Sequence, residues 1–89
     1  MTPEQRALFR LNLLQQLDAA GAIGMPVARL ELGARVARFE PAGEALRDEL
    51  QYLEDAATAA RIPQLLSPEM PRWRITKAGR DLLAAEGLA

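Results

Sequence analysis

The most regular alternation of apolar and polar positions lies between Ala42 and Ala60. At helical spacing, three leucines and one alanine of this segment fall on one narrow stripe: Leu46, Leu50, Leu53 and Ala57. The opposite side is acidic and has Arg47 as its only counter-charge; it carries Glu44, Asp48, Glu54 and Asp55. This pattern predicts an amphipathic helix over 42–60 that is buried along its leucines, with the other segments packed against it.

The first segment opens with a helix-start signal. Thr2 suits the capping position, Pro3 suits the first helical position, and Gln5 completes a capping box. We expect the helix to run to about Ala20 and to stop at Gly21, in the left-handed conformation that glycine adopts easily. Its apolar side contains Phe9, Leu13, Leu14, Leu17 and Ala20.

Two arginines interrupt this apolar side. Arg10 projects into its middle, and Arg6 lies beside it. One arrangement places the aliphatic stems over the edge of the core and the charged ends in water. The other pairs Arg10 with Glu49, which lies at the margin of the leucine stripe in 42–60. The sequence leaves both open.

Pro26 is predicted to open a second helix that ends near Phe39. Leu32, Val36 and Phe39 make its expected buried stripe, and Leu30 lies at the side. Gly33 in the middle indicates a bend or a close helix contact. The outer face carries Arg29, Arg35 and Arg38 against Glu31, and Glu40-Pro41 marks the turn that follows.

After Ala60 the helical spacing gives way to short stretches bounded by prolines, and this pattern predicts a two-stranded hairpin. Its strands cover 61–66 and 72–75, with a turn over 67–71, and Pro63 limits how far the first strand pairs. Trp73 and Ile75 are expected to face the core, with Arg72 and Arg74 in water. Thr76 then caps a final helix over 77–86, whose inward residues are Leu82 and Leu83 and whose end is Gly87.

The order is helix, helix, helix, hairpin, helix, which predicts a single mainly α domain over 1–89 with a winged helix-turn-helix arrangement. The run LRDELQYLED (46–55) resembles the third helix of winged-helix proteins. The run WRITKAGRDLL (73–83) is similar to their second wing strand and the helix after it, and LFRLNLLQQL (8–17) adds to the match. The likeness points to small, uncharacterised winged-helix proteins of Mu-like prophages. Many winged helices have glycine at the end of helix three, where this chain has Thr58-Ala59-Ala60.

Composition removes several classes of chemistry. The 89 residues contain no cysteine and no histidine, so disulfides, thiolate nucleophiles, cysteine zinc sites and imidazole bases are excluded. The few hydroxyl residues form no nucleophile motif. We therefore expect no enzyme activity, no cofactor, no metal and no small-molecule substrate. No apolar run is long enough to span a membrane and no signal peptide is evident, so we expect a cytoplasmic protein without a membrane partner.

Charge is distributed unevenly along the chain. Residues 40–55 contain six acidic residues and one basic residue, whereas residues 61–80 contain five basic residues and one acidic. The winged-helix resemblance implies that helix three reads bases, through Arg47, Gln51 and Thr58. Carboxylates beside phosphates oppose that use. The phosphate-contact candidates are therefore Arg72, Arg74, Lys77 and Arg80 at the wing and the last helix, with Arg35 and Arg38 as a possible second contact.

Two functions follow with equal weight. The first is a nucleic-acid-binding or transcription-related protein, derived from a phage or prophage, that contacts double-stranded DNA through its wing. The second is a winged helix used for protein assembly, with a partner protein or as a homodimer, since acidic and basic faces of different subunits are complementary. Trp73 either stacks on a base or belongs to the core, where a lone tryptophan usually lies. Glu44, Asp48 and Asp55 form either a weak hard-cation site or, more simply, a solvated helix face.

Overall fold

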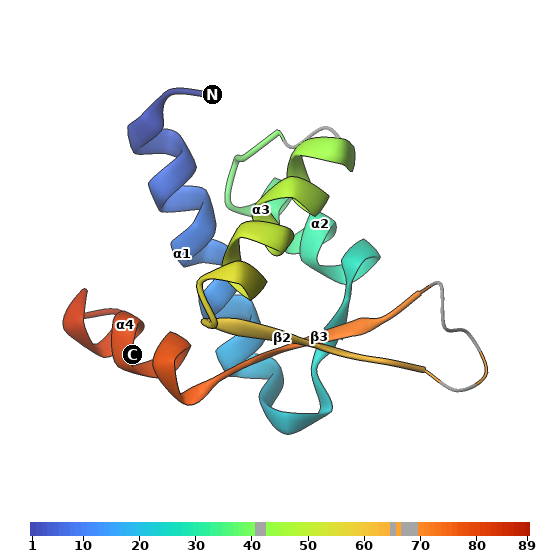
Figure 1. Cartoon of the computed structure of the whole chain (residues 1–89). Coiled ribbons are helices and arrows are strands. Elements are labelled where there is room, and N and C mark those ends of the chain that lie inside the picture. Colours follow the sequence, from blue (N-terminus) through green and yellow to red (C-terminus); the bar gives the residue numbers. More distant parts are fainter. Residues whose placement is uncertain (41–42, 65, 67–69) are drawn as a thin grey trace.

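The structure, a computed structural model, describes residues 1–40, 43–64, 66 and 70–89. It is mainly helical with one small antiparallel sheet (Figure 1). The elements in chain order are α1 (Pro3–Ala20), a 3-10 turn (Gly21–Ile23), β1 (Met25–Pro26), α2 (Val27–Val36), α3 (Gly43–Asp55), β2 (Ala59–Ile62), β3 (Arg72–Ile75) and α4 (Lys77–Ala85). The sequence predicted all four helices and two of the three strands.

Helix α1 forms as predicted. The Thr2 hydroxyl accepts a hydrogen bond from the Gln5 amide, the Gln5 side chain accepts one from the Thr2 amide, and Gly21 ends the helix at φ 68°. Four of the five predicted core residues are buried: Phe9, Leu13, Leu14 and Leu17. The later part of this helix passes behind β2 and β3 in Figure 1, and the helix contacts α2, α4 and β3.

Helix α2 is rotated relative to the predicted stripe. Leu32 and Val36 are 60% and 79% exposed, whereas Leu30 and Ala34 are fully buried, so the prediction of an inward Leu32 and Val36 is wrong. The small side of the helix faces α1. At Gly33, a Cβ atom would lie 2.0 Å from the Gln16 side-chain oxygen, which confirms the predicted close contact. The buried face of α2 therefore consists of Leu30 and Ala34, with Gly33 next to Gln16 of α1, and the predicted Leu32–Val36 stripe faces outward.

The end of α2 also falls earlier than predicted. Arg38 adopts a left-handed conformation with φ 69°, and the amide of Phe39 donates to the carbonyl of Ala34 at 2.9 Å. Phe39 therefore lies beyond the helix. Its ring still reaches the core, with a centroid 5.3 Å from that of Phe9.

Helix α3 carries the predicted leucines inward but is shorter than expected. Leu46, Leu50 and Leu53 are buried, while Ala57 is exposed and lies beyond the helix, so its predicted burial is wrong. Ala57 is left-handed at φ 61°. The Ala57 amide donates to the backbone carbonyl of Glu54, and the Thr58 amide donates to the backbone carbonyl of Leu53, each at 2.9 Å. In helix ends with this hydrogen-bond pattern, the residue that corresponds to Ala57 is usually glycine. The predicted start at Ala42 lies outside the described residues.

The sheet has three strands in the order β1-β3-β2, all antiparallel. The sequence missed β1, because a two-residue strand ending in proline has no alternation to detect. Strand β2 begins at Ala59 rather than at Arg61 and ends before Pro63. Strand β3 is as predicted, with Trp73 and Ile75 buried. The far ends of β2 and β3 point away from the helices (Figure 1). Position 65 of the predicted strand and positions 67–69 of the predicted turn lie outside the described residues.

Helix α4 closes the opposite end of the sheet. The Thr76 hydroxyl accepts a hydrogen bond from the Gly79 amide at 3.2 Å, and Gly87 ends the helix at φ 73°, both as predicted. Leu83 is fully buried, but Leu82 is 38% exposed, so its predicted inward position is wrong. Consecutive residues of an α-helix lie about 100° apart around its axis, so the two leucines face different directions. No helix in the described ranges is long and apolar enough to cross a membrane.

Candidate functional site

Two of the predicted phosphate contacts meet at one hollow. Arg74 on β3 and Arg80 on α4 both line a surface depression of about 510 Å³, together with Asp18 at the end of α1. Both arginines are exposed. Neither forms an ion pair with any residue in the described ranges. The fold therefore brings Arg74 and Arg80 to the same depression, which could not be deduced from their positions in the sequence.

The other two residues of that predicted group are already engaged. Arg72 is half-buried rather than facing water, because its guanidinium donates to the carbonyls of Ile23 and Gly24 at 3.0 and 3.1 Å. It fastens the turn before β1 to the sheet. Lys77 pairs with Asp81 at 2.9 Å, and both side chains are exposed. An exposed pair of this kind contributes little free energy, so Lys77 is easily released.

The predicted second contact on α2 divides in the same way. Arg35 pairs with Glu31 one turn earlier at 2.5 Å. Arg38 is exposed, just beyond the helix, in its left-handed conformation. Arg35 would therefore have to leave Glu31 before contacting a phosphate, whereas Arg38 is already exposed to solvent.

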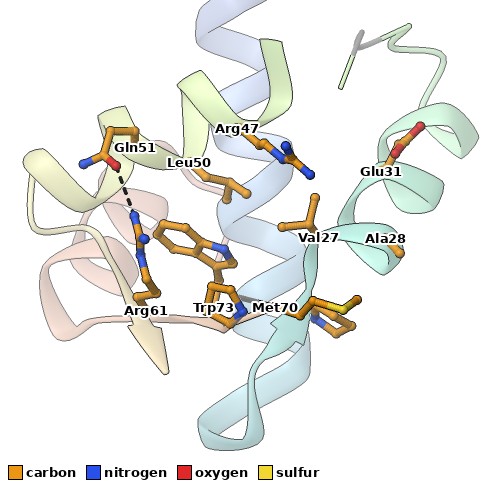
Figure 2. A pocket seen from close by; sticks show the side chains of 11 residues that line it. Val27, Ala28, Glu31, Arg47, Leu50, Gln51, Arg61, Met70 and Trp73 are labelled. Carbon is orange, nitrogen blue, oxygen red and sulfur yellow. Dashed lines mark hydrogen bonds between the residues drawn. The ribbon is translucent and has the colours of Figure 1, made fainter. Parts of the chain in front are cut away.

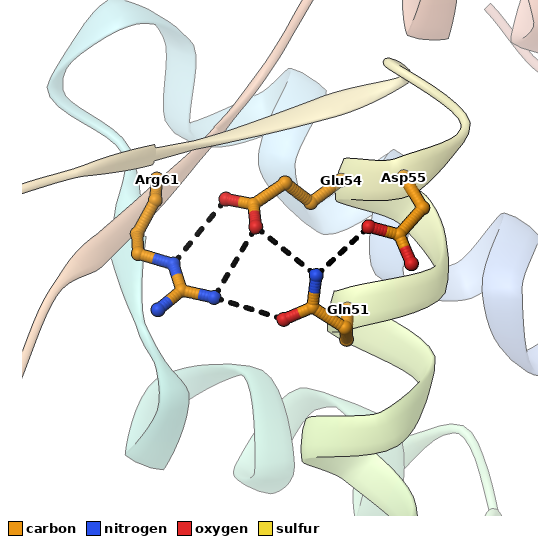
Figure 3. A network of polar contacts seen from close by, with 4 residues as sticks. All are labelled: Gln51, Glu54, Asp55 and Arg61. Atoms are coloured by element: carbon orange, nitrogen blue, oxygen red, sulfur yellow. Dashed lines mark hydrogen bonds and ion pairs between the residues drawn. The ribbon is translucent and has the colours of Figure 1, made fainter.

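Polar side chains on the surface of α3 hydrogen-bond to one another and to Arg61 on β2 (Figure 3). Gln51 donates to Glu54 and Asp55 at 3.2 and 2.9 Å, and its oxygen accepts from Arg61 at 3.1 Å. Arg61 also bridges to Glu54 at 3.3 Å. Gln51, one of the base-reading candidates, is therefore held in a network with two carboxylates.

The remaining base-reading candidates are separated. Thr58 lies beyond α3, so the prediction that it belongs to the third-helix surface is wrong; its hydroxyl donates to the carbonyl of Leu53 at 3.1 Å and completes the helix end. Arg47 is exposed on α3. The structure thus leaves Arg47 as the one accessible cation on a helix whose described exposed face also contains Glu44, Asp48 and Asp55.

On its other side, α3 is joined to α1 through a buried carboxylate. The Arg10 guanidinium donates to Glu49, and Arg6 lies 3.4 Å from the second Glu49 oxygen. The Glu49 side chain is only 11% exposed. Arg10 also lies 3.6 Å from the centroid of the Tyr52 ring. The cross-helix pair suggested by the sequence is therefore present.

A second hollow lies between α2, α3 and the sheet (Figure 2). Its volume is about 540 Å³. Helix α2 contributes Val27 and Glu31, and α3 contributes Arg47 and Leu50. The sheet side is formed by Pro26, Arg61, Met70, Pro71 and Trp73. We call this hollow the α2–α3 groove.

Trp73 forms the floor of the α2–α3 groove and is 5% exposed, so the interpretation as a core residue is the one the structure supports. The Arg61 guanidinium lies 4.9 Å from the centroid of its ring. The indole N–H has no hydrogen-bond partner among the described residues, although its nitrogen is buried. Such a group costs roughly 1–3 kcal/mol when left unpaired. The alternation of polar and apolar residues predicted the burial of Trp73, but it contains no signal for an N–H that lacks an acceptor among the described residues.

Carboxylates do not gather into a metal site in the described residues. No group of three or more histidine, cysteine, aspartate or glutamate side chains lies close enough to hold an ion there. Glu44, Asp48 and Asp55 instead lie along the solvent side of α3. Comparisons with protein families, with curated proteins and with solved structures found no match to this chain.

Proposed function

We propose that this protein is a winged-helix module that binds the phosphate backbone of double-stranded DNA through Arg74 and Arg80. The supporting observation is the shared hollow, where guanidiniums from β3 and α4 lie without a carboxylate partner in the described residues. Guanidinium is the side-chain group best suited to phosphate, because it donates two parallel hydrogen bonds. Asp18 in the same hollow reduces the local charge but leaves a net excess of one cation.

The order of elements supports the winged-helix part of this proposal. Helices α1 to α3, the β2–β3 hairpin and α4 follow one another as in the proteins that segments 46–55 and 73–83 resemble. Strand β1 adds a third strand to the wing sheet. The likeness to Mu-like prophage proteins favours a transcription-related role in a phage or prophage.

Under this proposal, α3 does not enter the major groove of the DNA. Its exposed carboxylates would each lie near phosphates, at a cost of roughly 0.5–1 kcal/mol per close pair even in water. Gln51 would also have to leave its contacts with Glu54, Asp55 and Arg61 before reading a base. Contact led by the wing avoids both costs, and Lys77 joins it once its exposed pair with Asp81 opens.

Fluorescence anisotropy with a labelled duplex at about 50 and about 200 mM salt tests this mode of binding. Two or three phosphate contacts predict an affinity loss of roughly 10- to 40-fold over that range. The double variant Arg74→Gln, Arg80→Gln should bind roughly tenfold or more weakly at low salt and show a shallower salt dependence. Arg29→Gln, which neutralises an exposed arginine on α2, is the matched control and should bind as the parent does. Equal binding by the double variant and the parent would exclude the proposed site.

Self-assembly is a second candidate because α2 presents two large apolar side chains to solvent. Leu32 and Val36 lie one turn apart and are 60% and 79% exposed. Arginines 29, 35 and 38 on the same helix and its end are complementary to the acidic face of α3 in a second copy. Light scattering after size exclusion would support this candidate if a dimer became a monomer when both residues were changed to serine. A monomer at all concentrations tested would remove the homodimer.

A further inference from the structure

The α2–α3 groove contains a hydrogen-bond donor that has no acceptor among the residues the structure describes. Trp73 is 95% buried, its Nε1 exposes less than 1 Å² to solvent, and no described residue accepts its N–H. Figure 2 shows the nitrogen on the side of the indole ring that faces the groove, across from Val27. Buried polar groups in proteins are nearly always paired, so an N–H that faces a hollow needs an acceptor there, which a water molecule or a bound ligand can supply.

Further donors surround the same space. The Arg47 guanidinium extends over the groove in Figure 2 and forms no ion pair within the described residues. The ten-residue helix α2 begins at the groove wall with Pro26 as its cap, and no side chain caps its first turn. The free N–H groups of such a turn add partial positive charge. Glu31 is the one carboxylate among the described residues of the lining, and it is already paired with Arg35.

Gln51 and Arg61 also line the groove, but Arg61 is engaged by the Gln51 oxygen and by Glu54. The other lining residues are apolar; among them are Val27 from α2, Leu50 from α3 and Met70, which is 66% exposed. Pockets with apolar walls, a few convergent polar groups and volumes in the range of roughly 300–1,000 Å³ are typical of small-molecule sites. The groove, at about 540 Å³, has these properties.

We propose that the α2–α3 groove binds a small organic carboxylate that has an apolar body. The carboxylate accepts hydrogen bonds from Trp73 Nε1 and from Arg47, and the apolar body contacts Val27 and Met70. Because Trp73 Nε1 is buried, side chains of the lining must shift before an acceptor reaches it. The same chemistry is offered by a free acid and by the terminal carboxylate of a peptide. This proposal uses none of the arginines assigned to DNA, so each can fail without the other.

Nuclear magnetic resonance provides a direct readout, because the chain has one tryptophan and therefore one indole N–H signal. The ¹⁵N-labelled protein is titrated with phenylacetate and, in parallel, with uncharged phenylacetamide. We expect the indole proton signal to move downfield and to saturate with phenylacetate in the millimolar range, as one charge-assisted hydrogen bond plus apolar contact predicts. Phenylacetamide, which has the same ring and no charge, should produce a much smaller shift.

Two variants locate the charge that is recognised. Arg47→Gln should weaken phenylacetate binding roughly tenfold, the usual effect of removing one hydrogen bond to a charged group. Arg29→Gln, an exposed arginine outside the groove lining, should leave it unchanged. A third titration with N-acetyl-Gly-Phe, as the free acid and as the amide, separates the sources: tighter binding of the peptide acid than of phenylacetate assigns the site to a chain terminus.

Three results would overturn the proposal. The first is an indole signal that does not move with phenylacetate or with the peptide acid. The second is an equal response to acid and amide, which would reduce the groove to an apolar surface. The third is unchanged binding by Arg47→Gln, which would place the anion elsewhere.

Discussion

The two sides of α3 treat their polar groups differently. Toward α1, Glu49 is buried but receives both Arg6 and Arg10, and Arg10 in turn lies against Tyr52. Toward α2 and the sheet, the buried Trp73 N–H and the exposed Arg47 have no partners within the described residues. The first side has its polar groups satisfied internally and serves stability. The second side leaves the Trp73 N–H and the Arg47 guanidinium available to bind a partner, as expected of a surface that binds a ligand.

The largest expected effect comes from breaking the satisfied side. Glu49→Ala removes the acceptor for two guanidiniums and leaves Arg10, 26% exposed, without a counter-charge. Because the pair is partly buried, we expect a loss of about 2 kcal/mol in the free energy of unfolding, between the values for exposed and buried pairs. Urea denaturation measures it.

The matched control is on the other side of the same helix. Arg47→Gln should change the free energy of unfolding by no more than about 0.5 kcal/mol, as for most exposed substitutions. A double-mutant cycle on Arg10 and Glu49 then isolates their coupling. A coupling indistinguishable from zero, or equal losses at residues 47 and 49, would contradict the contrast between the two sides.

A smaller effect, of opposite sign, is expected where α3 leads into the wing. Ala57 is exposed and left-handed at φ 61°, a conformation that disfavours a side chain. Ala57→Gly should therefore raise the free energy of unfolding by about 0.5–1 kcal/mol, measured by the same denaturation. Ala7→Gly, at an exposed interior position of α1, should instead lower it by about 1 kcal/mol. If both glycines destabilise, the conformation of residue 57 is not the strained one described above.

Much of the fold could be predicted because its signals are local. The capping box at Thr2, the leucine stripe of α3, the alternation of β3 and the cap at Thr76 each depend on a few neighbouring residues. The rotation of α2 could not be predicted this way. Its buried residues, Leu30 and Ala34, are those on the side where Gly33 lies close to Gln16 of α1, and that is a contact between distant parts of the chain.

The same distinction between local patterns and distant contacts applies to the candidate sites. Sequence position alone grouped Arg72, Arg74, Lys77 and Arg80, but pairing decided which of them are available, and only coordinates show that Arg72 holds the carbonyls before β1. The α2–α3 groove was not predicted at all. It is formed by side chains of α2, α3 and the sheet, and the Trp73 N–H in it has no acceptor among the described residues. A sequence pattern indicates which side chains are buried but not what they contact.

The short β2 strand has a further consequence for solubility. It has β3 on one side, and its other side is an open sheet margin within the described residues, the kind of surface onto which a stray extended chain adds. The strand is only four residues long, so an added chain would find few backbone groups to bond, and Pro63, which follows directly and has no amide hydrogen, stops the ladder from continuing. Aggregation by extension of the sheet at this margin is thereby discouraged.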